Sequence, residues 1–226
     1  MNTQALNLQH IFKTYKNTCC LNDININIES GSIIGLLGNN GAGKTTLLRL
    51  LTRLQLPSSG IIQYADGIHI GSLIEMPALY PTMSAFQNLE YHIHIASMPQ
   101  YSSAELLRLV GLPNTHQSVA TFSLGMRQRL GLAIALIEKP DLLLLDEPFN
   151  GLDPFGVRSI QEIITDLNHD LHTTIIVSSH DLHHLEKIAT HFVVLQEGKI
   201  ISNFRYNKDI SVNLEDIYFE HFSDTL

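Results

Sequence analysis

Two patterns of hydrophobic and polar residues divide the first part of the chain. Residues 5–15 and 20–30 alternate between apolar and polar side chains, with an isoleucine at every second position from Ile24 to Ile28. This alternation is typical of strands in a half-exposed antiparallel sheet. Residues 31–38 are instead continuously apolar and end in a glycine, which predicts a strand that is buried on both faces.

Further along the chain, short apolar runs alternate with segments that have helical spacing. Residues 142–146 and 173–180 are apolar runs typical of buried parallel strands, whereas residues 44–54 and 159–169 have the periodicity of helices. Strands that alternate with helices in this way indicate an α/β fold with a mostly parallel core sheet.

The middle of the chain, residues 76–136, has a different pattern. Four prolines interrupt it, and residues 84–96 and 102–111 have helical periodicity. We interpret it as a helical subdomain inserted into a single domain spanning 1–226, in which 1–75 and 137–226 form the α/β core with an N-terminal antiparallel β-subdomain. The tail after Gly198 is expected to begin as a strand and to end in a short helix at 214–222.

Composition and charge narrow the classes of function. The chain has 226 residues, of which 44% are apolar and 16% charged, so it can build a sizeable core. Its formal net charge of −8 argues against a nucleic-acid-binding protein, because the neutralisation of phosphates requires a basic surface.

Cysteine usage and the N-terminal residues predict the compartment. The only cysteines are Cys19 and Cys20, and adjacent cysteines are poorly placed to form a disulfide. Residues 1–10 do not resemble a signal peptide, and no run of about 18 apolar residues could span a bilayer. We therefore expect a cytoplasmic protein that reaches the membrane only through a partner.

Residues 38–45, GNNGAGKT, fit the pattern of a phosphate-binding loop. Glycines in such a loop let successive backbone N–H groups point at phosphate oxygens beside a helix N-terminus. Lys44 then contacts the β- and γ-phosphates, and the Thr45 hydroxyl is a ligand for Mg²⁺. A plain glycine turn is the alternative, but the buried strand before and the helix after favour a nucleotide site. The predicted nucleotide-binding residues here are Gly38, Asn39, Asn40, Gly41, Ala42, Gly43, Lys44, Thr45 and Thr46.

Residues 142–147, LLLLDE, place two acids at the end of a buried strand. Ligands of open α/β sheets bind at the carboxyl ends of the strands. Asp146 is suited to hold Mg²⁺ through water, and Glu147 to act as the general base toward an attacking water. The alternative is that the two acids only mark the point at which the strand leaves the core. The phosphate loop upstream makes this alternative less favoured.

These motifs, together with FSLGMRQRL at 122–130 and SSHD around His180, resemble an ATP-binding-cassette (ABC) ATPase subunit over essentially the whole chain. The resemblance implies a P-loop NTPase fold. It also implies that Tyr15 stacks on adenine, although a simple strand aromatic remains the alternative. Ser123, Gly125 and Asp153 match the signature motif and the loop that face the opposite subunit of a homodimer, and His180 matches the switch histidine at the γ-phosphate.

The sequence departs from the family pattern at several positions. The signature reads FSLGM, so that Leu124 and Met126 replace a glycine and a glutamine, and Phe149 replaces a threonine. The sequence offers no mechanistic account of Phe149. His183 and His184 could suggest a zinc site, but no third ligand is evident.

The resemblance extends to the ATP-binding subunits of bacitracin-type and lantibiotic self-immunity exporters. It implies ATP-driven closure of two cassettes against separately encoded permease subunits at the cytoplasmic face of the membrane, without direct binding of the transported peptide and without nucleic acid. A generic multidrug-type exporter cassette and a soluble ABC ATPase that transports nothing are the alternatives.

Glu75 occupies the position at which most ABC cassettes carry a glutamine. A carboxylate offers only acceptors and a charge, whereas an amide offers donors as well. Beside Mg²⁺ that charge is favourable, so we interpret Glu75 as a metal-dependent residue that couples the catalytic site to the helical subdomain. The alternative is a solvated loop acid.

Overall fold

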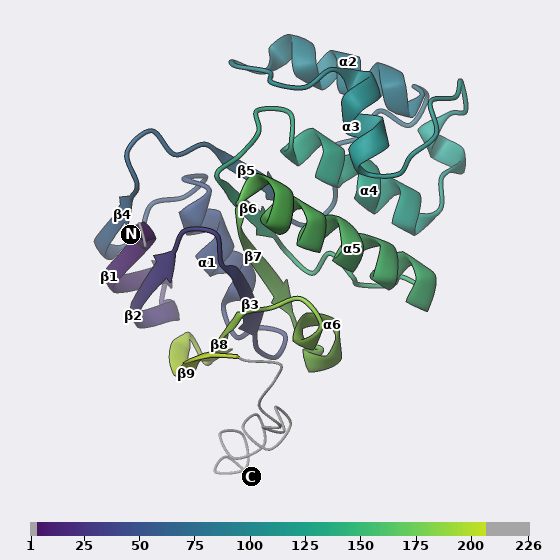
Figure 1. Ribbon diagram of the computed structural model, residues 1–226. Helices are drawn as coiled ribbons and strands as arrows, with labels where there is room; N and C mark the ends of the chain where they lie inside the picture. The colour runs from purple at the N-terminus through teal and green to yellow at the C-terminus, as the bar shows by residue number, and fades with distance from the viewer. Residues whose placement is uncertain (1–3, 207–226) are drawn as a thin grey trace.

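A computed structural model describes residues 4–206 of the chain (Figure 1). It confirms the expected α/β fold, in which an antiparallel sheet, a mostly parallel sheet and an inserted group of helices are combined. The helix predicted at 214–222 lies outside the described residues.

The N-terminal sheet is antiparallel, as the alternation of its residues predicts. It has three strands in the order β2-β1-β4, with bounds Thr18–Glu29, Gln4–Tyr15 and Ser59–Tyr64. In β2 the residues Ile24, Ile26 and Ile28 are buried while the residues between them face outward. β4 was not apparent from the hydrophobic pattern, since most of its residues are exposed.

The second sheet has six strands in the order β5-β6-β7-β3-β8-β9. All neighbouring strands are parallel except β8 and β9, which are antiparallel. In the same order their bounds are Ile70–Leu73, Leu142–Leu145, Thr174–Ser179, Ile33–Leu37, His191–Gln196 and Lys199–Arg205. β3, β6 and β7 consist entirely of buried residues, which explains their continuously apolar sequences.

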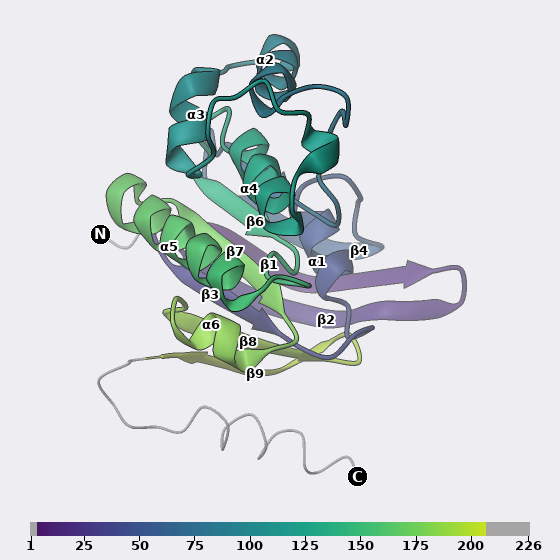
Figure 2. The ribbon, with the colours of Figure 1, turned by 90° about the vertical axis from the view of Figure 1, so that its right-hand side faces the viewer.

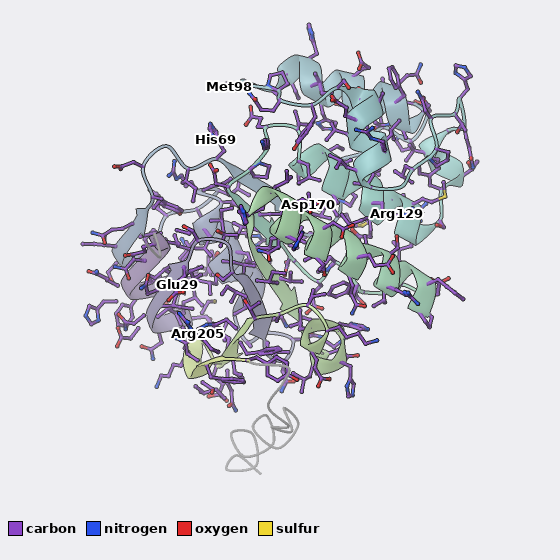
Figure 3. The ribbon with its side chains drawn as sticks, in the orientation of Figure 1. Glu29, His69, Met98, Arg129, Asp170 and Arg205 are labelled. Atoms are coloured by element: carbon purple, nitrogen blue, oxygen red, sulfur yellow. The ribbon has the colours of Figure 1, made fainter. Side chains whose placement is uncertain are left out.

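The two faces of this sheet pack against different partners. On one face, α1 (Lys44–Leu51) and the antiparallel sheet share a hydrophobic core with alternate residues of β3 and β6. On the other face the core includes α5 (Pro154–Leu171) and α6 (Leu182–Glu186). An ion pair between Glu29 of β2 and Arg205 of β9 adds a link between the two sheets (Figure 3).

The middle of the chain forms a group of helices at one end of the molecule (Figures 1 and 2). It contains α2 (Ala85–Ile95), α3 (Ser103–Leu109), the 3₁₀ helix η1 (Val119–Thr121) and α4 (Leu124–Ala135). α2 and α3 begin with capping boxes at Ser84 and Ser102, in which side chain and backbone satisfy each other's hydrogen bonds. The helical periodicity of 84–96 and 102–111 is therefore confirmed with slightly shorter helices.

Candidate functional site

The phosphate-binding loop joins the end of β3 to the start of α1. Gly43 precedes α1 with φ +109°, and a Cβ atom there would lie 2.8 Å from the carbonyl oxygen of Cys20. At Gly38 a Cβ atom would lie 2.3 Å from the carbonyl oxygen of Leu195. Only glycine fits these two positions, so the loop can follow this path close to β2 and β8.

Lys44, the first residue of α1, turns back into the loop. Its side chain is only 6% exposed, and Nζ donates hydrogen bonds to the carbonyl oxygens of Gly38 (2.6 Å) and Asn39 (3.3 Å). A buried ammonium at the start of a helix is a positive charge that favours an anionic ligand at this loop.

A buried hydrogen-bond network fixes the two acids that follow β6. The Thr45 hydroxyl donates to Oδ2 of Asp146 at 2.7 Å, and the Ser178 hydroxyl donates to Oδ1 at 2.6 Å. Ser178 Oγ also accepts a hydrogen bond from the backbone N–H of Glu147 at 2.9 Å. Asp146 is 6% exposed, so these hydroxyls stabilise a carboxylate that is largely withdrawn from water.

Glu147 lies between a cation and an imidazole. Its Oε1 is 3.1 Å from Lys44 Nζ, and its Oε2 is 2.9 Å from His180 Nδ1. Oε1 is buried and accepts no hydrogen bond from the described residues, so its contact with Lys44 is one of charge. Glu147 also has φ +47°, a strained conformation for a residue with a side chain.

Strand order explains why these residues meet. β6, β7 and β3 are neighbours and parallel, so their carboxyl ends lie at one edge of the sheet. β6 delivers Asp146 and Glu147, β7 delivers His180, and β3 delivers the phosphate-binding loop. Ligands of open α/β sheets bind at such an edge.

The structure places Ser123 and Asp153 at the starts of two helices. Ser123 Oγ accepts a hydrogen bond from the N–H of Met126 (3.2 Å) at the start of α4, and Asp153 Oδ1 accepts one from the N–H of Gly156 (2.7 Å) in α5. Both residues are exposed, and Gly125 is partly buried in the first turn of α4. Within residues 4–206 no recorded hydrogen bond or ion pair joins them to the phosphate-binding loop of their own chain.

Two departures from the family pattern have structural explanations. Phe149 is 2% exposed, with its ring centroid 5.2 Å from that of His184, so it is a core residue. Leu124 packs on the loop before α5, where a Cβ atom on Gly151 would lie 2.9 Å from Leu124 Cδ2.

Tyr15 lies at the tip of the β1–β2 hairpin. Its ring is 37% exposed, its hydroxyl donates to Oε1 of Gln55, and Lys13 Nζ lies 5.1 Å from the ring centroid. The start of β2 contacts the phosphate-binding loop at Gly43, so the hairpin tip is near that loop. The described residues show no group of three or more potential metal ligands around His183 and His184.

Glu75 follows β5 by two residues and has φ +62°. Its carboxylate pairs with the guanidinium of Arg49 on α1, and its side chain is 60% exposed. No recorded hydrogen bond or ion pair joins it to Thr45 or Asp146 within the described part of the chain.

Sequence reasoning missed two residues of this site, Ser178 and Arg49. Ser178 carried a signal, because it is a hydroxyl residue at the end of an apolar strand just before His180. Arg49 carried little signal, since its partner is 26 positions away on another element.

The chain is similar in sequence to known ABC transporter proteins. The family model for ABC transporters matches residues 21–150. Over 221 residues the chain is 41% identical to the lantibiotic transport ATP-binding protein SrtF of Streptococcus pyogenes, covering 94% of this chain and 95% of that protein. It is 38% identical over 209 residues to the bacitracin transport ATP-binding protein BcrA of Enterococcus faecalis, covering 87% and 68%.

Solved structures agree on the fold. The structure of cbiO1 from Clostridium perfringens, described as part of the ABC transporter complex cbiONQ, has a TM-score of 0.80 and 26% sequence identity, covering 91% of this chain and 89% of that one. Within residues 4–206, no helix combines the length and the apolar character that a membrane span requires.

Proposed function

Because this chain belongs to the ABC transporter family, and is an ATP-binding and ATP-hydrolysing transporter subunit, we propose that it powers the export of a peptide antibiotic and so protects its cell. The observation that carries this proposal is the similarity along nearly the whole chain to a lantibiotic transport subunit, with a bacitracin transport subunit also similar. The peptide itself would contact permease subunits encoded separately.

The phosphate-binding loop and Lys44 would hold the phosphates of ATP. Thr45 and Asp146 are suited to hold Mg²⁺, because a hydroxyl and a carboxylate 2.7 Å apart provide the hard oxygen ligands that this ion prefers. When bound, Mg²⁺ supplies positive charge that stabilises the phosphate oxygens during hydrolysis. The side chain of Tyr15 would stack on adenine from the hairpin tip.

Glu147 would act as the general base. Its Oε1 accepts no hydrogen bond from the described residues and lies 3.1 Å from Lys44, so it would take a proton from the attacking water once Lys44 has turned to the phosphates. His180 holds the other carboxylate oxygen at 2.9 Å, so it fixes the direction of Oε1 and would itself contact the γ-phosphate. Lys44, 3.1 Å from Glu147, would move toward the phosphates as the base is engaged.

A complete site would require two copies of the chain. Ser123, Gly125 and Asp153 are recorded without contact to their own phosphate-binding loop, and Ser123 and Asp153 are exposed at the starts of α4 and α5. Helix N-termini and hydroxyls favour anions. We therefore place Ser123 and Gly125 at the γ-phosphate bound by the opposite copy, and Asp153 in the loop that crosses the dimer interface, in an ATP-dependent homodimer.

A groove beside α4 would receive the permease at the cytoplasmic face of the membrane. Its volume is about 420 Å³, and it is lined mainly by apolar residues of the segment after Glu75, of η1 and of α4. Gln128 lines it as well, is 9% exposed, and its Oε1 is buried without a hydrogen-bond partner among the described residues. An apolar permease segment fits a groove with this lining.

Replacement of Lys44 by Ala in cells that carry this transporter tests the proposal. We expect greater sensitivity to lantibiotics or bacitracin, unchanged sensitivity to small cationic dyes, and hydrophobic permease subunits that co-purify with both native and K44A protein. Sensitivity to the dyes alone would instead establish a multidrug exporter. Co-purification of ribosomes or DNA in place of permeases would contradict transport altogether.

A further inference from the structure

An ion pair connects the helix after the phosphate-binding loop to the residue that precedes the helical subdomain. Arg49 lies in the last turn of α1, four residues after Thr45, and its guanidinium pairs with the carboxylate of Glu75. The exposed fractions of the two side chains are 34% and 60%. In the described part of the chain, Arg49 is the cation recorded in contact with Glu75.

Glu75 lies between the catalytic acids and α4. Two residues before it, the carbonyl oxygen of Leu73 accepts a hydrogen bond from the N–H of Asp146 at 2.9 Å. Two residues after it, Pro77 packs on α4, where a Cβ atom on Gly131 would lie 2.6 Å from the Cβ of Pro77. The chain on either side of Glu75 therefore contacts Asp146 and α4.

We infer that Arg49 is a positioning residue that holds the Glu75 carboxylate on the α1 side, away from the metal ligands Thr45 and Asp146. This inference rests on the proposed role of Glu75 beside Mg²⁺. A carboxylate paired with a guanidinium must give up that pair before it turns toward a metal ion. Arg49 thus opposes the arrangement of Glu75 that engages Mg²⁺, and a glutamine at position 75 would lack the charge on which Arg49 acts.

The size of the effect follows from the exposure of the pair. Partly exposed ion pairs contribute little free energy. Loss of this pair should therefore change the equilibrium between Glu75 paired with Arg49 and Glu75 turned toward the metal by about two- to fivefold. The direction of the change follows because Arg49 and the metal compete for the Glu75 carboxylate. Without the guanidinium, Glu75 turns toward the metal more readily, so less Mg²⁺ is needed for nucleotide binding.

The test is a double-mutant cycle of Arg49→Gln and Glu75→Gln in the full chain. The primary measurement is the Mg²⁺ concentration that gives half-maximal binding of a fluorescent ADP derivative, which requires no turnover. We expect R49Q to lower this concentration about two- to fivefold and to have no such effect in the E75Q background. The concentration for R49K should lie nearer the native value. The control R158Q removes the exposed Arg158–Glu162 pair of α5 and should change nothing.

Three outcomes would overturn the inference. They are an R49Q variant with unchanged Mg²⁺ dependence, one that requires more Mg²⁺, and one whose Mg²⁺ dependence shifts equally in the native and E75Q backgrounds. A purely structural role would change urea stability without changing the Mg²⁺ dependence. Failure of the proposed Mg²⁺ site at Thr45 and Asp146 is distinguishable, because the native chain would then bind nucleotide without any dependence on Mg²⁺. Failure of the proposed peptide export would leave that dependence intact and would show only in the resistance assay of the K44A variant.

Discussion

Removal of one buried hydroxyl, by Ser178→Ala, should both destabilise the protein and impair hydrolysis. Ser178 is 0% exposed, donates to the Asp146 carboxylate at 2.6 Å and accepts from the N–H of Glu147 at 2.9 Å. A hydrogen bond to a charged group contributes about 1.5–3 kcal/mol, and a buried N–H left without a partner costs about 1–3 kcal/mol. Since the effects overlap, we expect a loss of about 3 kcal/mol in the free energy of unfolding.

Urea unfolding followed by far-ultraviolet circular dichroism measures this loss. The same variant should lower kcat for ATP by about tenfold or more, because the acids at the end of β6 lose the group that orients them. Thr174→Val is a matched control on the same strand. It removes a hydrogen bond from the N–H of Gly31 (3.0 Å) at the opposite end of β7, and should cost about 1 kcal/mol with kcat unchanged.

An S178A variant whose free energy of unfolding lies within about 0.5 kcal/mol of the native value, and whose kcat is unchanged, would show that Ser178 does not orient the two acids. Equal losses of kcat in S178A and T174V would show that the effect on hydrolysis is a general consequence of destabilisation.

Three further predictions concern packing and charge. Phe149→Ala should destabilise the chain by about 3–5 kcal/mol in urea unfolding, because it empties a buried aromatic site; a near-native value would contradict its place in the core. Gly71→Ala should cost about 1–3 kcal/mol in the same assay, since its Cβ atom would lie 2.2 Å from the carbonyl oxygen of Ala135; native stability would contradict this packing. The hydrogen bond and charge of Asp170 raise the pKa of His169 above its ordinary value of 6.5, so the resulting stability is present below that pH and lost as pH rises through the folded-state pKa. Asp170→Asn should return the pKa of His169 toward 6.5 in an NMR titration; an unchanged pKa would contradict the pairing.

The hydrophobic pattern predicted most of the strands that form the site. β3, β6 and β7 were evident because strands buried on both faces are continuously apolar. β4 and β5 were not predicted, since β4 is largely exposed and β5 is not continuously apolar, with the exposed Ser72 between the buried Gly71 and Leu73. Their sequences therefore lack a pattern that distinguishes them from loops.

The site residues that directly follow a buried strand could be predicted from the sequence. Contacts between side chains on different helices and strands were harder to predict. The strand ends in the sequence predict Lys44, Asp146, Glu147 and His180 at one sheet edge, and the structure brings these four side chains together. The partner of Glu75 could not be predicted, because the pairing depends on how α1 packs beside the segment after β5. The burial of Phe149 likewise depends on tertiary packing rather than on local sequence.

Phosphate release from ATP by the Glu147→Gln variant measures whether Glu147 is the general base. We expect E147Q to bind ATP with an affinity within a few-fold of native protein and to release phosphate about 10²–10⁴ times more slowly. We also expect E147Q to accumulate as an ATP-bound homodimer in size-exclusion chromatography with light scattering. Phosphate release by E147Q at close to the native rate would contradict the assignment of Glu147 as the general base.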